Sequence, residues 1–327
     1  MGKIQTKALV EGAIFASVTA ILGILYYYMQ YLGVIAMVWP VPVIIVGYRN
    51  GLKASILSAL SAGLIVSLLT QPLVGVGLLV GFGLPGVLMG YMINKRVNPY
   101  LVVFLCGLVL SITMVGELLL SLKAAGIDTF QFLAGIDDAF KQQLDMAVNI
   151  YKKFGIAEKD LQSMSDYFTQ TIEMMKLILP SALVISGLMF SFIDYKLTRL
   201  ILKRIGQSIP NIEEFSKWRL TEPYSFILLG LAVFAGAVSY LQIPGLNTAA
   251  LNISTVLMFI FSIIGVSIIA YYARVYGDRN GIPKALRRII VVLIVLVFMQ
   301  FIALAGILDL VFNFRKLEPE NCTGGIK

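Results

Sequence analysis

The sequence contains no histidine among its 327 residues. This absence excludes a Ser-His-Asp triad, an imidazole general base, and zinc or haem held by histidine. Only two cysteines occur, Cys106 in an apolar run and Cys322 near the end, so neither a disulfide framework nor a cysteine metal site is expected. No G-x-x-x-x-G-K-[ST] phosphate loop is present. We therefore expect no bound cofactor or metal, and no ATP hydrolysis by that route.

Charged residues are scarce as well, at 13%, whereas 58% of the residues are apolar or aromatic. A soluble domain carries about a quarter charged residues, so this chain is predicted to have the lipid bilayer as its main solvent. The sequence predicts an all-α, polytopic transmembrane helix bundle. The net charge of +8 is accounted for by membrane topology and attraction to anionic lipid, and no nucleic-acid partner is expected.

Apolar runs between charges predict the transmembrane spans, each of which needs about 20 residues. If the N-terminus is cytoplasmic, the inner connections hold 17 of the 26 lysines and arginines, as the positive-inside rule requires. Arg315 and Lys316 would then lie outside, against that rule. We expect a multi-pass protein of a bacterial plasma membrane with a cytoplasmic N-terminus. The nine predicted spans are roughly residues 8–28, 31–48, 52–70, 74–93, 99–121, 177–197, 223–241, 250–272 and 289–312.

These spans divide the chain into a six-helix core over 1–200, a cytoplasmic interfacial segment over 201–222, and three C-terminal spans with a tail over 223–327. An outer insert over 122–176 interrupts the core and contains two stretches with apolar residues at helical spacing. These stretches predict two helices, which lie either on the membrane face or bundle end, or as a lid over an outward-facing cavity.

The first span carries a row of small residues, Ala8, Gly12, Ala16 and Ala20, at every fourth position. Such a face lets another helix approach closely and gain van der Waals contact. Two interpretations remain open: the face packs inside the protein's own bundle, or it docks a partner membrane subunit. In the fourth span, Pro85 with its neighbouring glycines predicts a break near 81–86, either a structural kink or the wall of a cavity.

Glu117 lies in the outer half of the fifth span with no basic residue within one helical turn. A charge at the bilayer centre costs on the order of 3 kcal/mol, so this carboxylate must be paired, hydrogen-bonded or protonated. We predict that it contacts a solute or cation, together with Trp39, Gln71 and Tyr31. Asp194 and Asp309, by contrast, are expected to form ion pairs at the ends of their spans.

An intramembrane aspartyl protease needs two facing aspartates. The predicted spans place Asp194 at the inner surface and Asp309 at the outer one, so the two would not meet. Intramembrane serine and metal proteases need histidine, which is absent. We therefore expect that the protein is not an enzyme.

Two segments resemble S components of energy-coupling-factor transporters: K-A-L-V-E-G-A-I-F-A-S-V-T-A-I-L at 7–22 and W-P-V-P-V-I-I-V-G-Y-R-N-G-L-K-A at 39–54. This resemblance implies a six-helix bundle that binds a vitamin-sized solute from outside. It also implies that the alanine face of the first helix meets a transmembrane coupling subunit, which works with ATPases. The nickel and cobalt branch relies on an N-terminal histidine and is disfavoured.

The wider chain resembles the YybS-like family of bacterial membrane proteins. The matching pieces are F-S-K-W-R-L at 215–220, A-Y-Y-A-R-V-Y-G-D-R-N-G-I-P at 270–283 and G-I-L-D-L-V-F-N-F-R-K at 306–316. From all of this we predict an integral membrane protein that binds a small solute from the outer side and takes part in its transport with partner subunits. The alternative is a membrane scaffold that docks other proteins through its small-residue faces and its outer insert.

Overall fold

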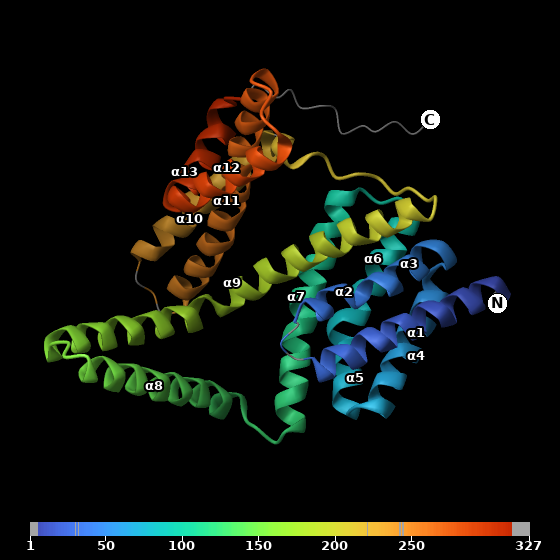
Figure 1. Ribbon diagram of the computed structural model, residues 1–327, viewed down its shortest axis with the longest axis horizontal. Helices are drawn as coiled ribbons and strands as arrows, with labels where there is room; N and C mark the ends of the chain where they lie inside the picture. The colour runs from blue at the N-terminus through green and yellow to red at the C-terminus, as the bar shows by residue number, and fades with distance from the viewer. Residues whose placement is uncertain are drawn as a thin grey trace. The chain divides into compact units, whose positions relative to one another are not determined.

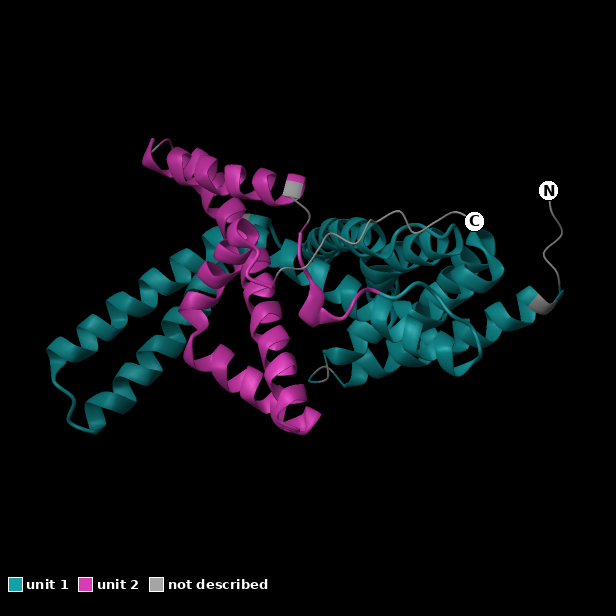
Figure 2. Ribbon diagram, turned by 90° about the horizontal axis from the view of Figure 1, so that it is seen from above, with its two compact units in different colours: residues 1–211 teal, residues 212–327 magenta. Residues whose placement is uncertain are grey.

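A computed structural model describes residues 6–29, 31, 33–220, 222–241, 243 and 245–315. Within these ranges the chain is all-helical and contains no β-strand (Figure 1). It divides into two compact units, Met1–Asn211 and Ile212–Lys327 (Figure 2). Seven helices in the described part are long and apolar enough to cross a membrane, or eight if one bent pair counts as a single span. The predicted polytopic helical class is therefore confirmed, but the count of nine straight spans is not.

Unit 1 is a bundle in which neighbouring helices pack as the pairs α1 with α4, α3 with α6, and α7 with α9. A 17-residue apolar stretch over Val34–Asn50 replaces the expected second span and is shorter than the other spanning helices. The elements of unit 1 are α1 (Thr6–Tyr28), α2 (Val34–Val38), α3 (Pro40–Asn50), α4 (Leu52–Leu69), α5 (Pro72–Leu78), the π-helix η1 (Leu79–Gly83), α6 (Leu84–Asn94), α7 (Pro99–Ala124), α8 (Thr129–Lys153) and α9 (Glu158–Arg204).

The small-residue face of α1 is covered within unit 1. Gly12, Ala16 and Ala20 are buried, and the Ser58 hydroxyl on α4 donates a hydrogen bond to the Gly12 carbonyl over 3.2 Å. Ala8, near the start of the helix, remains partly exposed. The packing fits the interpretation that this face serves the chain's own bundle, and a partner subunit would reach it only if α4 moved.

The outer insert does not end where the sixth span begins. α9 runs unbroken over 47 residues, about 70 Å at 1.5 Å per residue, so the second amphipathic stretch and the predicted sixth span form one helix. α8 doubles back along the first half of α9 (Figure 1). The Lys176 amine on α9 forms an ion pair with Asp137 on α8 at 2.8 Å, which ties the hairpin together.

Unit 2 consists of the short 3₁₀ helix η2 (Phe215–Lys217), α10 (Glu222–Tyr240), α11 (Leu246–Arg279), α12 (Lys284–Val297) and α13 (Met299–Phe312). The prediction of one straight span over 289–312 is wrong, because α12 and α13 meet at Phe298 with a bend of 103°.

Close packing of α13 on α11 accounts for this bend. At the crossing, a Cβ atom added to Gly265 or Gly306 would overlap the backbone of the other helix. Farther along, the Tyr272 hydroxyl donates to the Phe314 carbonyl over 3.3 Å. This contact and the 2.8 Å hydrogen bond from Arg315 to the Ser267 hydroxyl place the end of α13 beside the C-terminal half of α11.

A buried arginine joins the end of α13 to η2 and α11. The Arg315 guanidinium binds Asp309 at 2.8 Å, the Ser267 hydroxyl at 2.8 Å, and the carbonyls of Ser216 and Trp218 at 3.1 and 2.8 Å. Both charged side chains are fully buried. The expected pairing of Asp309 with Arg315 is thus present. The nine-span prediction separates this pair from residues 215–218 by the membrane, whereas the structure places the two side by side.

Candidate functional site

The face of α7 that carries Glu117 packs against the broken helix formed by α5, η1 and α6. Thr113 and Glu117 are one turn apart, so both side chains lie on this face. The opposing surface is smooth because it is built from glycine, with Gly77 in α5 and Gly81 in η1. These residues form what we call the glycine break.

Proline determines where this helix breaks. Pro85 has no N–H to donate to the carbonyl of Gly81, four residues earlier, and its ring crowds that carbonyl. The chain responds with a π-helical turn over Leu79–Gly83. The Thr113 hydroxyl donates a 2.7 Å hydrogen bond to the Gly81 carbonyl, which supplies a partner for it. The neighbouring helix therefore stabilises the break, as backbone inside a membrane requires.

The Glu117 carboxylate lies directly on the glycine break. Its Oε1 is 3.0 Å from the point where a Cβ atom of Gly77 would be, and a Cβ on Gly81 would overlap Oε2. Glu117 is partly buried, and within the described part of the chain it makes no hydrogen bond or ion pair. The Tyr26 phenol on α1 is close enough to interact with it electrostatically. The arrangement leaves a hydrogen-bond acceptor, the Glu117 carboxylate, in contact with the glycine break.

Trp39 lies on another side of the same break. It is fully buried, and its ring atoms are 3.6 Å from the position of a Cβ on Gly83. Its indole N–H has no hydrogen-bond partner in the described residues, although such groups are usually paired when buried. The structure therefore brings two of the predicted site residues, Glu117 and Trp39, to one helical break.

The other two predicted residues are not part of this arrangement. Tyr31 is fully exposed in the connection between α1 and α2. Gln71 is exposed at the residue before α5, where its carbonyl accepts from the Val74 N–H over 3.0 Å. Neither side chain has a described contact with Glu117, so their role in solute binding stays a prediction.

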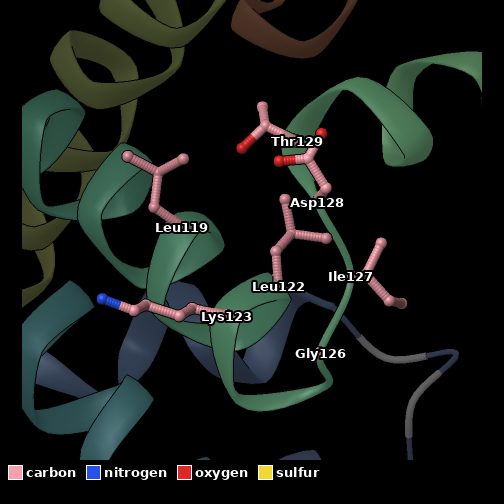
Figure 3. Close-up of a pocket in the computed structure, with 7 residues that line it drawn as sticks. All are labelled: Leu119, Leu122, Lys123, Gly126, Ile127, Asp128 and Thr129. Atoms are coloured by element: carbon pink, nitrogen blue, oxygen red, sulfur yellow. The ribbon is translucent and has the colours of Figure 1, made fainter.

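An open hollow of about 490 Å³ lies beyond Glu117, at the corner between α7 and α8. Figure 3 shows the oxygen atoms of Asp128 and Thr129 at the start of α8, with the Lys123 amine pointing away from them. The hollow begins at Leu119, two residues after Glu117, and continues past the end of α7 to the first residue of α8. The lining residues are Leu119, Leu122, Lys123, Gly126, Ile127, Asp128 and Thr129.

Thr113 and Tyr26 were not predicted as part of the site. Thr113 precedes Glu117 by four residues, and this spacing alone places it on the same helix face. Tyr26 belongs to a run of three tyrosines, which the sequence explains most simply as an aromatic belt at the membrane interface and alternatively as a stacking surface for a planar ligand. Only the folded structure, which brings the Tyr26 phenol near the Glu117 carboxylate, separates the two roles.

Apolar helices that span a membrane, arranged around a broken helix with an embedded carboxylate, define a polytopic integral membrane protein. The family model described as predicted membrane protein DUF2232 matches residues 17–310, and the chain belongs to this family. It is also similar to the uncharacterized protein YybS of Bacillus subtilis (strain 168), with 31% identity over 327 residues, covering 95% of this chain and 98% of that protein. No solved structure matches significantly.

Proposed function

We propose that this protein binds a small solute from the outer side of a bacterial plasma membrane, at Glu117, and takes part in its transport. The observation that carries the proposal is the Glu117 carboxylate, which lies on the glycine break without a hydrogen bond or ion pair in the described residues. A group of this kind favours a solute that carries a positive charge or hydrogen-bond donors. The proposal includes no catalytic step.

The chain has no phosphate loop of the ATP-binding type, so we propose that partner subunits supply the energy, including a transmembrane coupling subunit and ATPases. Gly12, Ala16 and Ala20 are covered by α4, so a coupling subunit has to use another face of unit 1 or displace α4. We place the N-terminus in the cytoplasm, where the basic connections satisfy the positive-inside rule.

A solute bound at Glu117 should raise the melting temperature of the wild-type protein in lipid nanodiscs but not that of the Glu117→Gln variant. Glutamine keeps the shape of the side chain and removes its charge. A ligand at 100 times its Kd contributes about 2.7 kcal/mol to stability. The measurement is a thermal-shift screen with vitamins, nucleosides, amino acids, lipids and metal ions. In a Trp218→Phe background, the remaining Trp39 reports the same binding event by its fluorescence.

Glu173→Gln is the matched control, because it makes the same chemical change at an exposed position of α9. Gly81→Ala is the second site variant, since the added Cβ displaces the carboxylate of Glu117 without altering its charge. If no compound shifts the melting temperature, or if Glu117→Gln responds as fully as wild type, solute binding at Glu117 is wrong.

The second candidate function is a membrane scaffold that docks other proteins. The observation that favours it is the α8–α9 hairpin, which exposes large apolar side chains such as Phe154, Tyr167 and Met174. Under this function, co-purified proteins should depend on the hairpin, and Glu117→Gln should leave them unchanged.

A further inference from the structure

The interface between α7 and α9 places Asp194 at the start of α7. The Ser111 hydroxyl donates to the Leu183 carbonyl over 3.1 Å, and the Ser191 hydroxyl donates to the Val103 carbonyl over 2.9 Å. These two pairs show that the helices run antiparallel. Continuing the same register brings Asp194 beside the first turns of α7, far along that helix from Glu117.

Asp194 is 4% exposed, and its Oδ1 is buried without a hydrogen-bond partner in the described residues. Asp194 forms no ion pair with any described residue, although the sequence predicts one. Thr198 lies one turn farther on the same face, fully buried, and its hydroxyl also has no partner there. Two unpartnered polar groups are therefore adjacent in the protein interior, where each is costly.

The charged and titratable groups around Asp194 are engaged elsewhere or do not reach it. On α7, the Cys106 thiol is close enough for an electrostatic interaction with Asp194, but it points its hydrogen at the Met92 sulfur at 4.0 Å. On α3, Arg49 is paired with Glu11, and the Tyr48 hydroxyl donates to the Ser208 carbonyl.

The neighbours on α9 itself do not bind Asp194 either. The Tyr195 hydroxyl donates to the Pro210 carbonyl, and Lys196 lies over the ring of Phe192. Arg199 forms no ion pair with Asp194.

The number of ligands decides which occupant fits. Hard metal cations require about six or more oxygen ligands, whereas this position offers one carboxylate and one hydroxyl. No group of three or more metal-binding side chains occurs among the residues that the structure describes. A proton needs only one acceptor, and it removes the charge that burial disfavours.

We infer that Asp194, with the Thr198 hydroxyl beside it, is a proton-binding site at the α7–α9 interface, separate from Glu117. The proton moves between the Asp194 carboxyl group and water, which reaches it through the small exposed fraction of the side chain. Thr198 is the neighbour that can donate to the carboxylate or accept from the carboxylic acid. The inference does not depend on the solute proposed for Glu117.

Infrared difference spectra of wild type against Asp194→Asn, in nanodiscs, test the site directly. Asparagine imitates the neutral acid in shape and polarity, so the variant is expected to fold. The wild type should show the C=O band of a protonated carboxyl group at low pH, and this band should lose intensity as the pH is raised. A band that is absent throughout, or constant throughout, overturns the inference.

Carbodiimide labelling in native membranes gives a second readout, because this reagent attacks protonated carboxyl groups in apolar surroundings. Peptide mass spectrometry separates Asp194 from Glu117, so the result is independent of the proposed solute site. Labelling of Asp194 should fall about tenfold or more between pH 5 and pH 9. Asp309 is the internal control: it is equally buried but paired with Arg315, and it should stay unlabelled. Equal labelling of the two aspartates contradicts the proposal.

Discussion

Replacing Arg315 by alanine is expected to lower the free energy of unfolding by about 3–5 kcal/mol, because it leaves a buried carboxylate without its partner. Arg315 donates to Asp309, to the Ser267 hydroxyl and to the carbonyls of Ser216 and Trp218. All of these partners lose a donor together. Denaturant titration of the purified protein in mixed micelles, followed by the fluorescence of its two tryptophans, measures the loss.

The expected loss of stability arises because the ion pair is buried, and removing an exposed arginine should cost much less. Arg274→Ala removes an arginine that pairs with Glu214 at a solvent-exposed position, and it should cost at most about 1 kcal/mol. The double variant Arg315→Met with Asp309→Leu should recover most of the stability, because replacing a buried ion pair with apolar residues of similar volume is often neutral. If Arg315→Ala and Arg274→Ala are equally mild, the buried pair does not hold unit 2 together.

The helical class of this protein follows from composition alone, but the count of spans does not. The run over 289–312 is long and apolar, and neither glycine nor proline interrupts it at Phe298. A straight helix and a bent pair therefore look the same in sequence. The bend arises from tertiary packing, since the close crossing at Gly265 and Gly306 holds α13 against α11. No local pattern contains that information.

In α9 the sequence predicts two elements where the structure has one continuous helix. Its polarity changes near residue 177, so the sequence predicts a surface helix followed by a span. Helical hydrogen bonds are formed within the helix itself, so the backbone can continue from polar into apolar surroundings. Pro180 lies within α9 without ending it.

The candidate site was partly predictable. Glu117 was identifiable as an embedded charge without a neighbouring base, and the glycines and Pro85 marked the break opposite it. What the sequence could not supply is the pairing of α7 with η1, on which the Thr113 contact depends. Tyr31 and Gln71 are polar residues near the ends of predicted spans, a property that does not require proximity to Glu117.

The bend in unit 2 predicts on which side of the membrane the chain's last described residues lie. Arg315 contacts the carbonyls of Ser216 and Trp218, so residue 314 and residue 217 should be accessible from the same side. By the positive-inside rule, we expect the lysines and arginines near this end of the unit to lie in the cytoplasm. A straight ninth span predicts instead that residue 314 is outside, together with residue 241.

Single cysteines at Lys217, Phe314 and Leu241, all exposed positions, distinguish these arrangements in a Cys322→Ser background. A membrane-impermeant maleimide should modify Lys217→Cys and Phe314→Cys only in inverted vesicles, and Leu241→Cys only in intact cells. The parent without an introduced cysteine is the control, because Cys106 is buried. Labelling of Phe314→Cys from the same side as Leu241→Cys contradicts the bent arrangement. If Phe314→Cys and Lys217→Cys are instead labelled from the same side, Arg315 lies on the cytoplasmic side of the membrane. Its position then satisfies the positive-inside rule, which a straight ninth span violates.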